Sequence, residues 1–449
     1  MIPGHADVES RAPVATTMRG VAANTAWLLL DRIGRMGVGL LLSVWLARSQ
    51  GPESFGLWSY VLALAALFSA LAGLGLDGIV VRELVRTPDR SQELLGSAAL
   101  LKALAGVAAC LMGLAAVRLL RPGDELVLKL MALSTLAFLF QPADVVEFLF
   151  QSRLEQRFAV LARSAAFLVF AGIKVALLIR HAGLMAFAWA TLAEVILGSA
   201  LLLATYQVRH GAVRAWQARA SVVAQLLRDS WPLTLAAVVV VVYMKMSQVI
   251  VGDRLGQRAL GIFSAATRLS EVWYFLPVVV TTSILPLLVS ARSRGLASFH
   301  RQLQRLYDVL AWMSLAVAAV VTFLADWIVA TVYGAQYEGA GEILAIQIWA
   351  AVFVYLGVAS SQYLLAENLT RVAFLRTALG ALVNVIATWM VVPMWGVRGA
   401  ALASVLAYAV ATFSMAVDSR TRLTVRMMLH SFNPLRVMGR GTPGGGTAE

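Results

Sequence analysis

The chain has 449 residues, of which 60% are hydrophobic and 14% are charged, and its mean hydropathy is +0.78. Soluble domains carry about 25% charged residues, so the composition excludes a soluble globular enzyme. The net charge of +13 comes from basic residues between hydrophobic runs, not from a basic patch with interleaved aromatic residues, which argues against nucleic-acid binding and indicates membrane topology.

Residues 1–19 are polar and contain proline, without the pattern of a cleavable signal peptide. Apolar runs follow, each close to the roughly 20 residues that a helix needs to cross the bilayer core. The sequence predicts about twelve membrane-spanning helices, at 22–47, 55–80, 94–117, 126–150, 158–180, 183–206, 231–252, 262–290, 306–329, 342–365, 372–392 and 396–417.

Basic residues are distributed unevenly between the loops that this topology creates. With both termini on one side, the segments on that side hold 23 of the 37 Lys and Arg residues, and the opposite loops hold 7. Short cytoplasmic loops carry the excess of basic residues in membrane proteins. We therefore expect both termini in the cytoplasm.

The two halves of the chain resemble each other in sequence. SQGPESFGLWS (49–59) aligns with RLGQRALGIFS (254–264) at a constant shift. The alignment pairs Gly51 with Gly256, Gly56 with Gly261, and Ser59 with Ser264. Because each half has an even number of spans, the copies are expected to be parallel, related by an axis along the membrane normal.

The expected fold is therefore an all-α polytopic membrane protein with about twelve transmembrane helices in two six-helix lobes. Its predicted parts are a cytoplasmic tail at 1–21, an N-lobe at 22–206, a cytoplasmic linker at 207–230, a C-lobe at 231–417 and a disordered, basic and glycine-rich cytoplasmic tail at 418–449.

Charged residues inside the spans are the candidates for function, because a charge in the bilayer core is costly and marks a polar pathway. Four deep cations outnumber their acids, so we expect a water-filled cavity in which they contact an anion: Arg32, Arg35, Lys245 and Arg268. The candidates for coupling transport to a proton or sodium ion are the carboxylates Asp31, Glu194 and Glu271.

Each of these charges also has a structural interpretation. Arg268 with Glu271, and Asp31 with Arg35, can form self-neutralising pairs that hold helices together. Lysines near helix ends can extend their ammonium groups to the membrane surface, and this interpretation is favoured for Lys102, Lys129 and Lys174. Asp144 and Glu147 approach the cytoplasmic end of their span and can be ordinary interfacial residues.

The sequence contains no pattern of soluble-type catalysis. There is no GxxxxGK[ST] phosphate loop, and the five histidines are scattered over tails and loops without metal-ligand spacing. The predicted external loops are short, which argues against a membrane-embedded glycosyltransferase or polymerase. We therefore expect no catalytic residue, no metal and no cofactor.

The segment 24–84 resembles the oligosaccharide or polysaccharide flippase family of the multidrug/oligosaccharidyl-lipid/polysaccharide exporter superfamily. The carrying motifs are ARSQGPESFG (47–56), LGLDGIVVREL (74–84) and GVRGAALA (396–403). Gln50 departs from the family pattern, in which a leucine is usual at this position. Length and span number match the family over nearly the whole chain.

The resemblance implies a V-shaped, two-lobed transporter that alternates between inward- and outward-facing states in the bacterial inner membrane. The implied cargo is an undecaprenyl-diphosphate-linked oligosaccharide for O-antigen, capsule or exopolysaccharide synthesis. Glycosyltransferases and a polysaccharide polymerase are then candidate partners, and no nucleic acid is expected. The alternative is a drug or organic-cation antiporter of the same superfamily, which the basic surplus in the spans disfavours.

Overall fold

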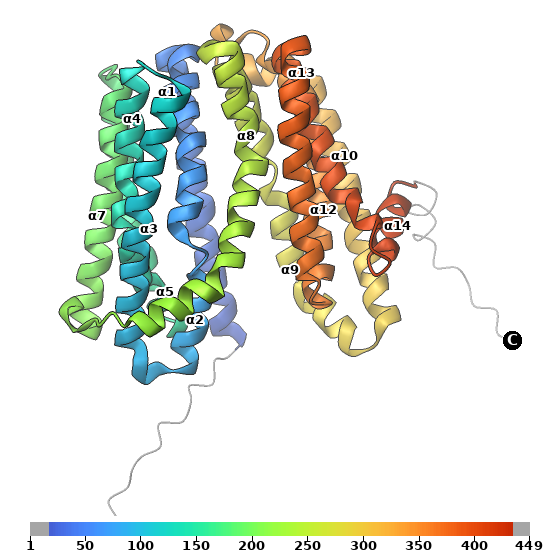
Figure 1. Ribbon diagram of the computed structural model, residues 1–449. Coiled ribbons are helices and arrows are strands. Elements are labelled where there is room, and N and C mark those ends of the chain that lie inside the picture. The colour runs from blue at the N-terminus through green and yellow to red at the C-terminus, as the bar shows by residue number, and fades with distance from the viewer. Residues whose placement is uncertain (1–17, 434–449) are drawn as a thin grey trace, which may run out of the picture.

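The structure is a computed structural model that describes residues 18–433, and their side chains from residue 34 onward except Pro286. The described chain folds into helices without strands (Figure 1). The α-helices are α1 (Met18–Gly73), α2 (Asp77–Arg86), α3 (Ser91–Leu120), α4 (Glu125–Leu136), α5 (Val145–Ser152), α6 (Gln156–Ile179), α7 (Leu184–His210), α8 (Ala220–Val272), α9 (Phe275–Ser293), α10 (Leu296–Val332), α11 (Ala340–Gln347), α12 (Ala350–Ala366), α13 (Thr370–Phe413) and α14 (Arg422–Ser431). Five 3-10 helices join them, at Pro88–Arg90, Ala137–Asp144, Val213–Ala215, Ala335–Tyr337 and Ser414–Ala416.

Three helices are too long to cross a bilayer once. At 1.5 Å per residue, the 56 residues of α1 would extend for about 84 Å, against a hydrocarbon core of about 30 Å. Each long helix reverses at one glycine with a positive φ: Gly51 (φ 79°), Gly256 (φ 84°) and Gly396 (φ 57°). Glycine adopts these angles because it lacks a Cβ.

These turns reconcile the helices with the predicted spans. The described residues contain nine helical segments that are long and apolar enough to cross a membrane. Three of them contain the turn glycines, and each of these three supplies two spans. The structure thus confirms the expected all-α polytopic fold of about twelve spans.

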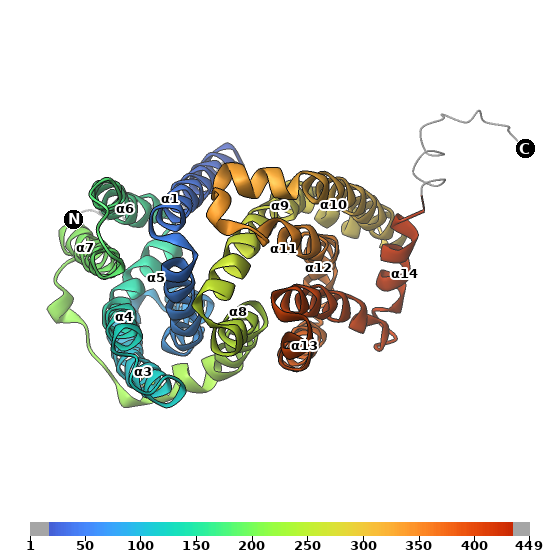
Figure 2. The same cartoon turned by 90° about the horizontal axis from the view of Figure 1, so that it is seen from above.

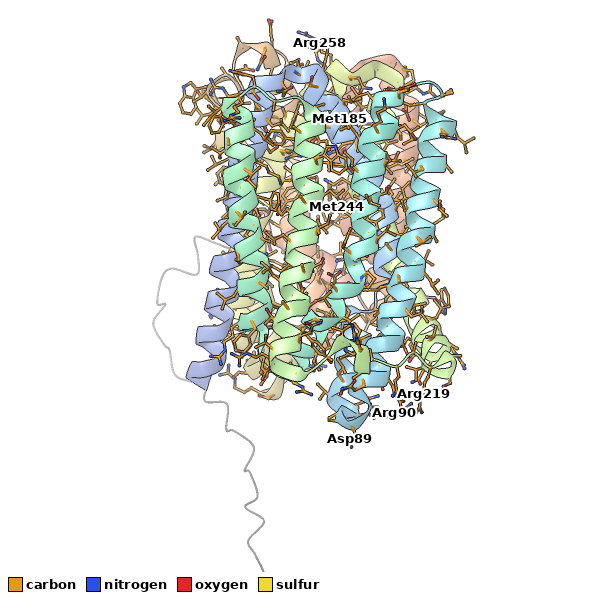
Figure 3. All side chains as sticks on the ribbon, turned by 90° about the vertical axis from the view of Figure 1, so that its left-hand side faces the viewer. Asp89, Arg90, Met185, Arg219, Met244 and Arg258 are labelled. Carbon is orange, nitrogen blue, oxygen red and sulfur yellow. The ribbon has the colours of Figure 1, made fainter. Side chains whose placement is uncertain are left out.

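The helices form two groups that meet along α1 and α8. In Figures 1 and 2 the first half (α1–α7) lies on one side and the second half (α8–α13) on the other. Figure 3 shows Arg258 at one end of the helices, Asp89, Arg90 and Arg219 at the other, and Met244 between them. Charged ends and an apolar middle fit a protein that spans a bilayer.

The two halves touch at one end through a reciprocal contact between their first glycine turns. A Cβ on Gly56 would lie 1.9 Å from the carbonyl oxygen of Gln257, and a Cβ on Gly261 would lie 1.9 Å from that of Pro52. Positions 52 and 257, like 56 and 261, are 205 residues apart. The contact therefore has an approximate two-fold symmetry that matches the sequence repeat, and we name it the closed end.

Two further hydrogen bonds at the closed end obey the same symmetry. Arg121, after α3, donates to the carbonyl oxygen of Gly252 at 2.6 Å, and the Tyr337 hydroxyl, after α10, donates to that of Ala47 at 3.0 Å. Ala47 and Gly252 are also 205 residues apart. Each half thus uses the loop after its third span to hold the first turn of the other half.

The connection between the halves is shorter than the predicted linker 207–230. α7 continues to His210 and α8 begins at Ala220. The polar residues of this stretch predicted a linker, but Val222 and Leu226, one helical turn apart, are buried in a core with residues of α3 and α7. An amphipathic helix therefore forms within the predicted linker.

The prediction of a disordered tail at 418–449 is wrong for its first part. Residues 422–431 form α14, whose Val425 and Met428 are buried. The Gln304 side chain of α10 donates to the carbonyl oxygen of Met427 at 3.0 Å. The apolar residues recur at helical spacing between the arginines, and neighbouring α10 gives them a surface to cover. Residues 434–449 lie outside the described part.

Candidate functional site: the central cavity

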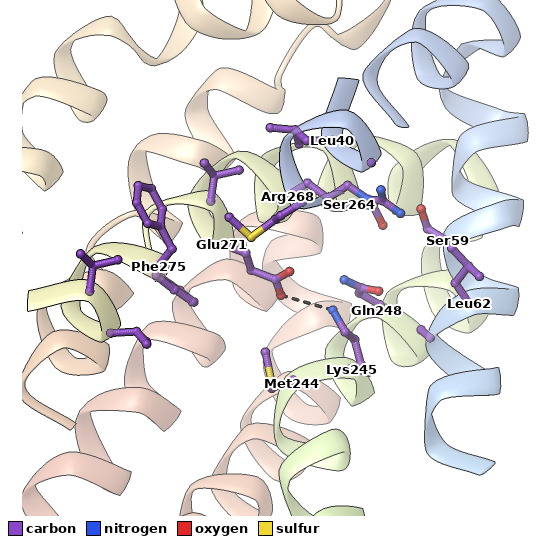
Figure 4. A pocket seen from close by; sticks show the side chains of 17 residues that line it. Leu40, Ser59, Leu62, Met244, Lys245, Gln248, Ser264, Arg268, Glu271 and Phe275 are labelled. Atoms are coloured by element: carbon purple, nitrogen blue, oxygen red, sulfur yellow. Dashed lines mark hydrogen bonds and ion pairs between the residues drawn. The ribbon is translucent and has the colours of Figure 1, made fainter. Parts of the chain in front are cut away.

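A cavity of about 730 Å³ lies between the two halves, lined by α1, α8 and α9 (Figure 4). Its polar lining consists of Ser59 from the first half and Lys245, Gln248, Ser264, Arg268, Glu271 and Tyr274 from the second. The apolar lining includes Leu40, Leu62, Ala63, Met244, Phe275 and Val278. Such a mixture of apolar walls and a few convergent polar groups is typical of a ligand site.

Among the described side chains, the charged residues of the cavity lining all come from the second half. Residues 205 positions apart occupy equivalent places in the two halves, so Lys245 corresponds to Leu40 and Arg268 to Ala63. The first half thus presents an apolar surface where the second half presents cations. A ligand in this cavity meets its charge contacts on the α8 side.

Lys245 and Glu271 form an ion pair across the turn of α8. Their Nζ and Oε1 atoms are 3.3 Å apart, and the two side chains are 26% and 27% exposed. The partial exposure keeps both groups accessible from the cavity. Because this pair is neutral as a whole, Arg268 supplies the net positive charge of the described cavity lining.

Arg268 is held by two residues of α1. Its guanidinium donates a hydrogen bond to the Ser43 hydroxyl and lies 5.3 Å from the ring centre of Phe55. This contact places a cation of the second half against the first. Arg268 is therefore positioned by both halves at the closed end.

The other predicted site residues lie elsewhere. Arg35 lines a separate cavity of about 350 Å³ inside the first half. Glu194 pairs with Lys174, with 2.7 Å between the charged atoms, across α6 and α7. The side chains of Asp31 and Arg32 lie outside the described part of the structure. Of the candidates for cargo and ion contact, Lys245, Arg268 and Glu271 share the central cavity.

A buried charge cluster in the first half was not predicted. The Lys102 side chain is 3% exposed, and its Nζ lies 3.2 Å from Asp144 Oδ2. Arg163 of α6 contacts both Asp144 and Glu147. The interpretation of Lys102 as a snorkelling residue is therefore wrong, because its partner 42 positions later neutralises it inside the protein. The sequence held one signal of this cluster: Asp144 and Glu147 are three residues apart, a spacing that places two side chains on the same face of a helix.

The chain is similar to known proteins in sequence and in structure. The family model described as "Polysaccharide biosynthesis protein" matches residues 21–292. No curated protein matches the sequence. Among solved structures, the lipid II flippase MurJ in an inward closed conformation has a TM-score of 0.71 at 16% identity, over 94% of each chain.

Two structures of multidrug resistance MATE family transporters of the MOP superfamily also match. The inward-facing one has a TM-score of 0.69 at 15% identity, over 91% of this chain and 96% of that one. The outward-facing one has a TM-score of 0.56 at 16% identity, over 93% of this chain and 97% of that one. These matches establish a shared transporter fold, and the agreement is closer for the inward-facing state.

Proposed function

We propose that the chain, which belongs to the polysaccharide biosynthesis protein family, carries an undecaprenyl-diphosphate-linked oligosaccharide from the cytoplasmic to the outer leaflet by alternating access. Arg268 in the central cavity carries this proposal. A lipid diphosphate is an anion whose head group must leave water to cross the bilayer. A guanidinium in the cavity wall replaces part of that hydration with charge-assisted hydrogen bonds.

The one-sided cavity suits such an amphiphilic cargo. Arg268 and Lys245 offer cations on the second half, and Leu40 and Ala63 offer an apolar surface on the first. The diphosphate then lies against the cationic wall. The Arg268 guanidinium can donate two hydrogen bonds to it, and the Lys245 ammonium adds a compact positive charge. Arg32 and Arg35 remain in the proposal only as contacts along the entry path.

The membrane potential is a sufficient driving force in principle. Moving one charge through 100 mV is worth about 2.3 kcal/mol, and a diphosphate with about two negative charges gains about twice that on leaving an inside-negative cell. Exchange for a proton or sodium ion at Glu271, Asp31 or Glu194 adds to this drive. Because Glu271 faces the cavity, it is the first of these three to test.

The proposed orientation places both termini in the cytoplasm of a bacterial cell, with the protein in the inner membrane. The bias of 23 to 7 basic residues between the two sides supports this orientation. The closer match to inward-facing transporters supports it too, because α2 and α9, on the side of the described N-terminus, lie apart in Figure 1. Glycosyltransferases that build the cargo and a polymerase that consumes it are the proposed partners.

The decisive experiment is reconstitution in vesicles with a fluorescent polyprenyl-diphosphate oligosaccharide. We expect the label to become protected from an external quencher only when the protein is present, and Arg268→Ala to slow this protection at least tenfold. Arg118→Ala, which removes an exposed arginine at the end of α3, is the matched control and should leave the rate unchanged.

Two outcomes would contradict the proposal. Organic-cation efflux without lipid movement would instead support the antiporter alternative, in which Glu271 binds the cation. Lengthening of the glycan with consumption of a sugar donor would support a polymerase or glycosyltransferase.

A further inference from the structure

Two serine hydroxyls line the central cavity without a hydrogen-bond partner. Ser59 is 4% exposed and Ser264 is 1% exposed, and neither Oγ atom is paired within the described part of the chain. Both residues belong to the cavity lining. A buried hydroxyl without a partner costs free energy and calls for an explanation.

The two serines are equivalent in the repeat. Ser59 follows Gly56 by three residues, and Ser264 follows Gly261 by three residues. Each half therefore contributes one hydroxyl about one helical turn from the reciprocal glycine contact. Both residues line the same cavity, on two helices that meet at the closed end.

Arg268 lies beside this pair. All three residues line the central cavity, and in the view of Figure 4 their labelled side chains lie above the ion pair of Lys245 and Glu271. A guanidinium has five N–H donors, and within the described residues Arg268 uses one of them, toward Ser43. The site thus offers two hydroxyls and several unused N–H groups.

A phosphate group satisfies all of these donors at once. Its oxygens accept hydrogen bonds from hydroxyls and from guanidinium, and its charge complements that of Arg268. A neutral sugar hydroxyl can pair with a serine but leaves Arg268 without a counter-ion. We propose that Ser59, Ser264 and Arg268 form a phosphate subsite for the cargo that exists only while the closed end is closed.

This subsite rests on the proposed function and adds a mechanism of release to it. Since its hydroxyls come from different halves, separation of the closed end pulls them apart. A ligand that binds one state more tightly shifts the population toward that state. The phosphate therefore holds the closed end shut while bound, and its affinity falls when this end opens.

The first test is binding of farnesyl diphosphate, which carries no sugar, to the purified full-length protein. We expect Ser59→Ala and Ser264→Ala each to weaken binding roughly tenfold, the size of one hydrogen bond to a charged group. Ser314→Ala is the control, because that buried hydroxyl donates to a backbone carbonyl within α10.

The second test follows the closed end directly. After Cys110→Ala, spin labels at positions 118 and 338 report the distance between the halves at this end. Farnesyl diphosphate should narrow the distance distribution toward the short, closed population in the parent protein and fail to do so in the double serine variant. Rescue by Ser59→Thr, which restores a hydroxyl, would separate hydrogen bonding from packing.

The outcomes distinguish this subsite from the proposed function. Equal affinity of parent and serine variants for farnesyl diphosphate overturns the subsite, while vesicle transport still tests flipping independently. In a second such outcome, the serine variants bind farnesyl diphosphate as tightly as the parent does and bind only a glycosylated polyprenyl diphosphate more weakly. That result would assign the serines to the sugar and likewise overturn the phosphate assignment.

Discussion

Lys102 shows what a buried charge in a membrane helix requires. Its side chain is 3% exposed and its charge is compensated by Asp144, so Asp144→Asn leaves a buried cation without its carboxylate. We expect this variant to lose about 3 kcal/mol of stability, visible as a lower melting temperature in detergent. Lys102→Met combined with Asp144→Asn should recover most of the loss, because both charges are then gone.

A control for this prediction lies in the same half. Lys129 pairs with Glu125 at the surface, where the side chains are 62% and 80% exposed. Such exposed pairs contribute less than about 1 kcal/mol, and Lys129→Met should leave the melting temperature nearly unchanged. A double Lys102/Asp144 variant no more stable than Asp144→Asn would show that the pair is not coupled.

The sequence could name candidate charges but not their neighbours. Helical periodicity indicates which side chains share a face, and the cost of a charge in the bilayer core marked Lys245, Arg268 and Glu271 as candidates. Arg35 meets the same criterion, yet its helix face borders a cavity with Asp144 and Glu147. Which helix a face contacts depends on packing between distant segments, which the local pattern of residues along one helix does not indicate.

Glycine turns are the elements that the sequence predicted best. Gly51 and Gly256 were aligned as equivalent residues, and they adopt nearly the same backbone angles, φ 79° with ψ 171° and φ 84° with ψ 179°. A turn of this kind depends on local chain geometry, so local sequence is enough to indicate it. The helix α14 was missed because its apolar residues lie between arginines and gain their burial by packing on other segments, mainly α10.

The contact of Gly56 with Gln257 leads to a prediction about the closed end. A Cβ at Gly56 would overlap a backbone carbonyl, which cannot turn aside as a flexible side chain could. Gly56→Ala should therefore push the two halves apart and increase the distance between labels at 118 and 338. Gly172→Ala is the control, since a Cβ at that helical position has no atom within 4 Å; an unchanged distance in Gly56→Ala would contradict the closed-end contact.

The docking of α14 is also testable through one buried and one exposed residue. Met428 is 0% exposed and Leu429 is 57% exposed. Met428→Ala should destabilise the protein by about 2 kcal/mol because it leaves a cavity against the rest of the fold, whereas Leu429→Ala should stay within about 0.5 kcal/mol. Equal melting temperatures for the two variants would mean that α14 is not docked as described.

At the scale of the whole molecule, the repeat has kept its backbone and lost its chemical symmetry. The closed end is two-fold in its glycines, carbonyls and serines, but among the described residues the cations that line the central cavity come from the second half. An alternating-access transporter needs halves that can rock against each other about equivalent contacts, whereas cargo recognition needs no such equivalence. Different residues of the same helices thus form the symmetric contacts of the closed end and the cationic contacts for the cargo.

This separation predicts that the key cation can be moved across the symmetry axis. Ala63 is the equivalent of Arg268 and lines the same cavity, and Gln248 stands where Ser43 holds Arg268. In the Arg268→Ala background, Ala63→Arg should restore a measurable part of vesicle transport, because Gln248 can accept a guanidinium hydrogen bond while the serine pair is unchanged. Restoration should be incomplete, since Leu260 replaces the aromatic ring of Phe55 at the equivalent place.

The control for this prediction is Ala63→Gln in the same Arg268→Ala background, which adds a polar side chain without the charge and should restore no transport. Equal transport by both double variants would show that the position of the cation does not matter.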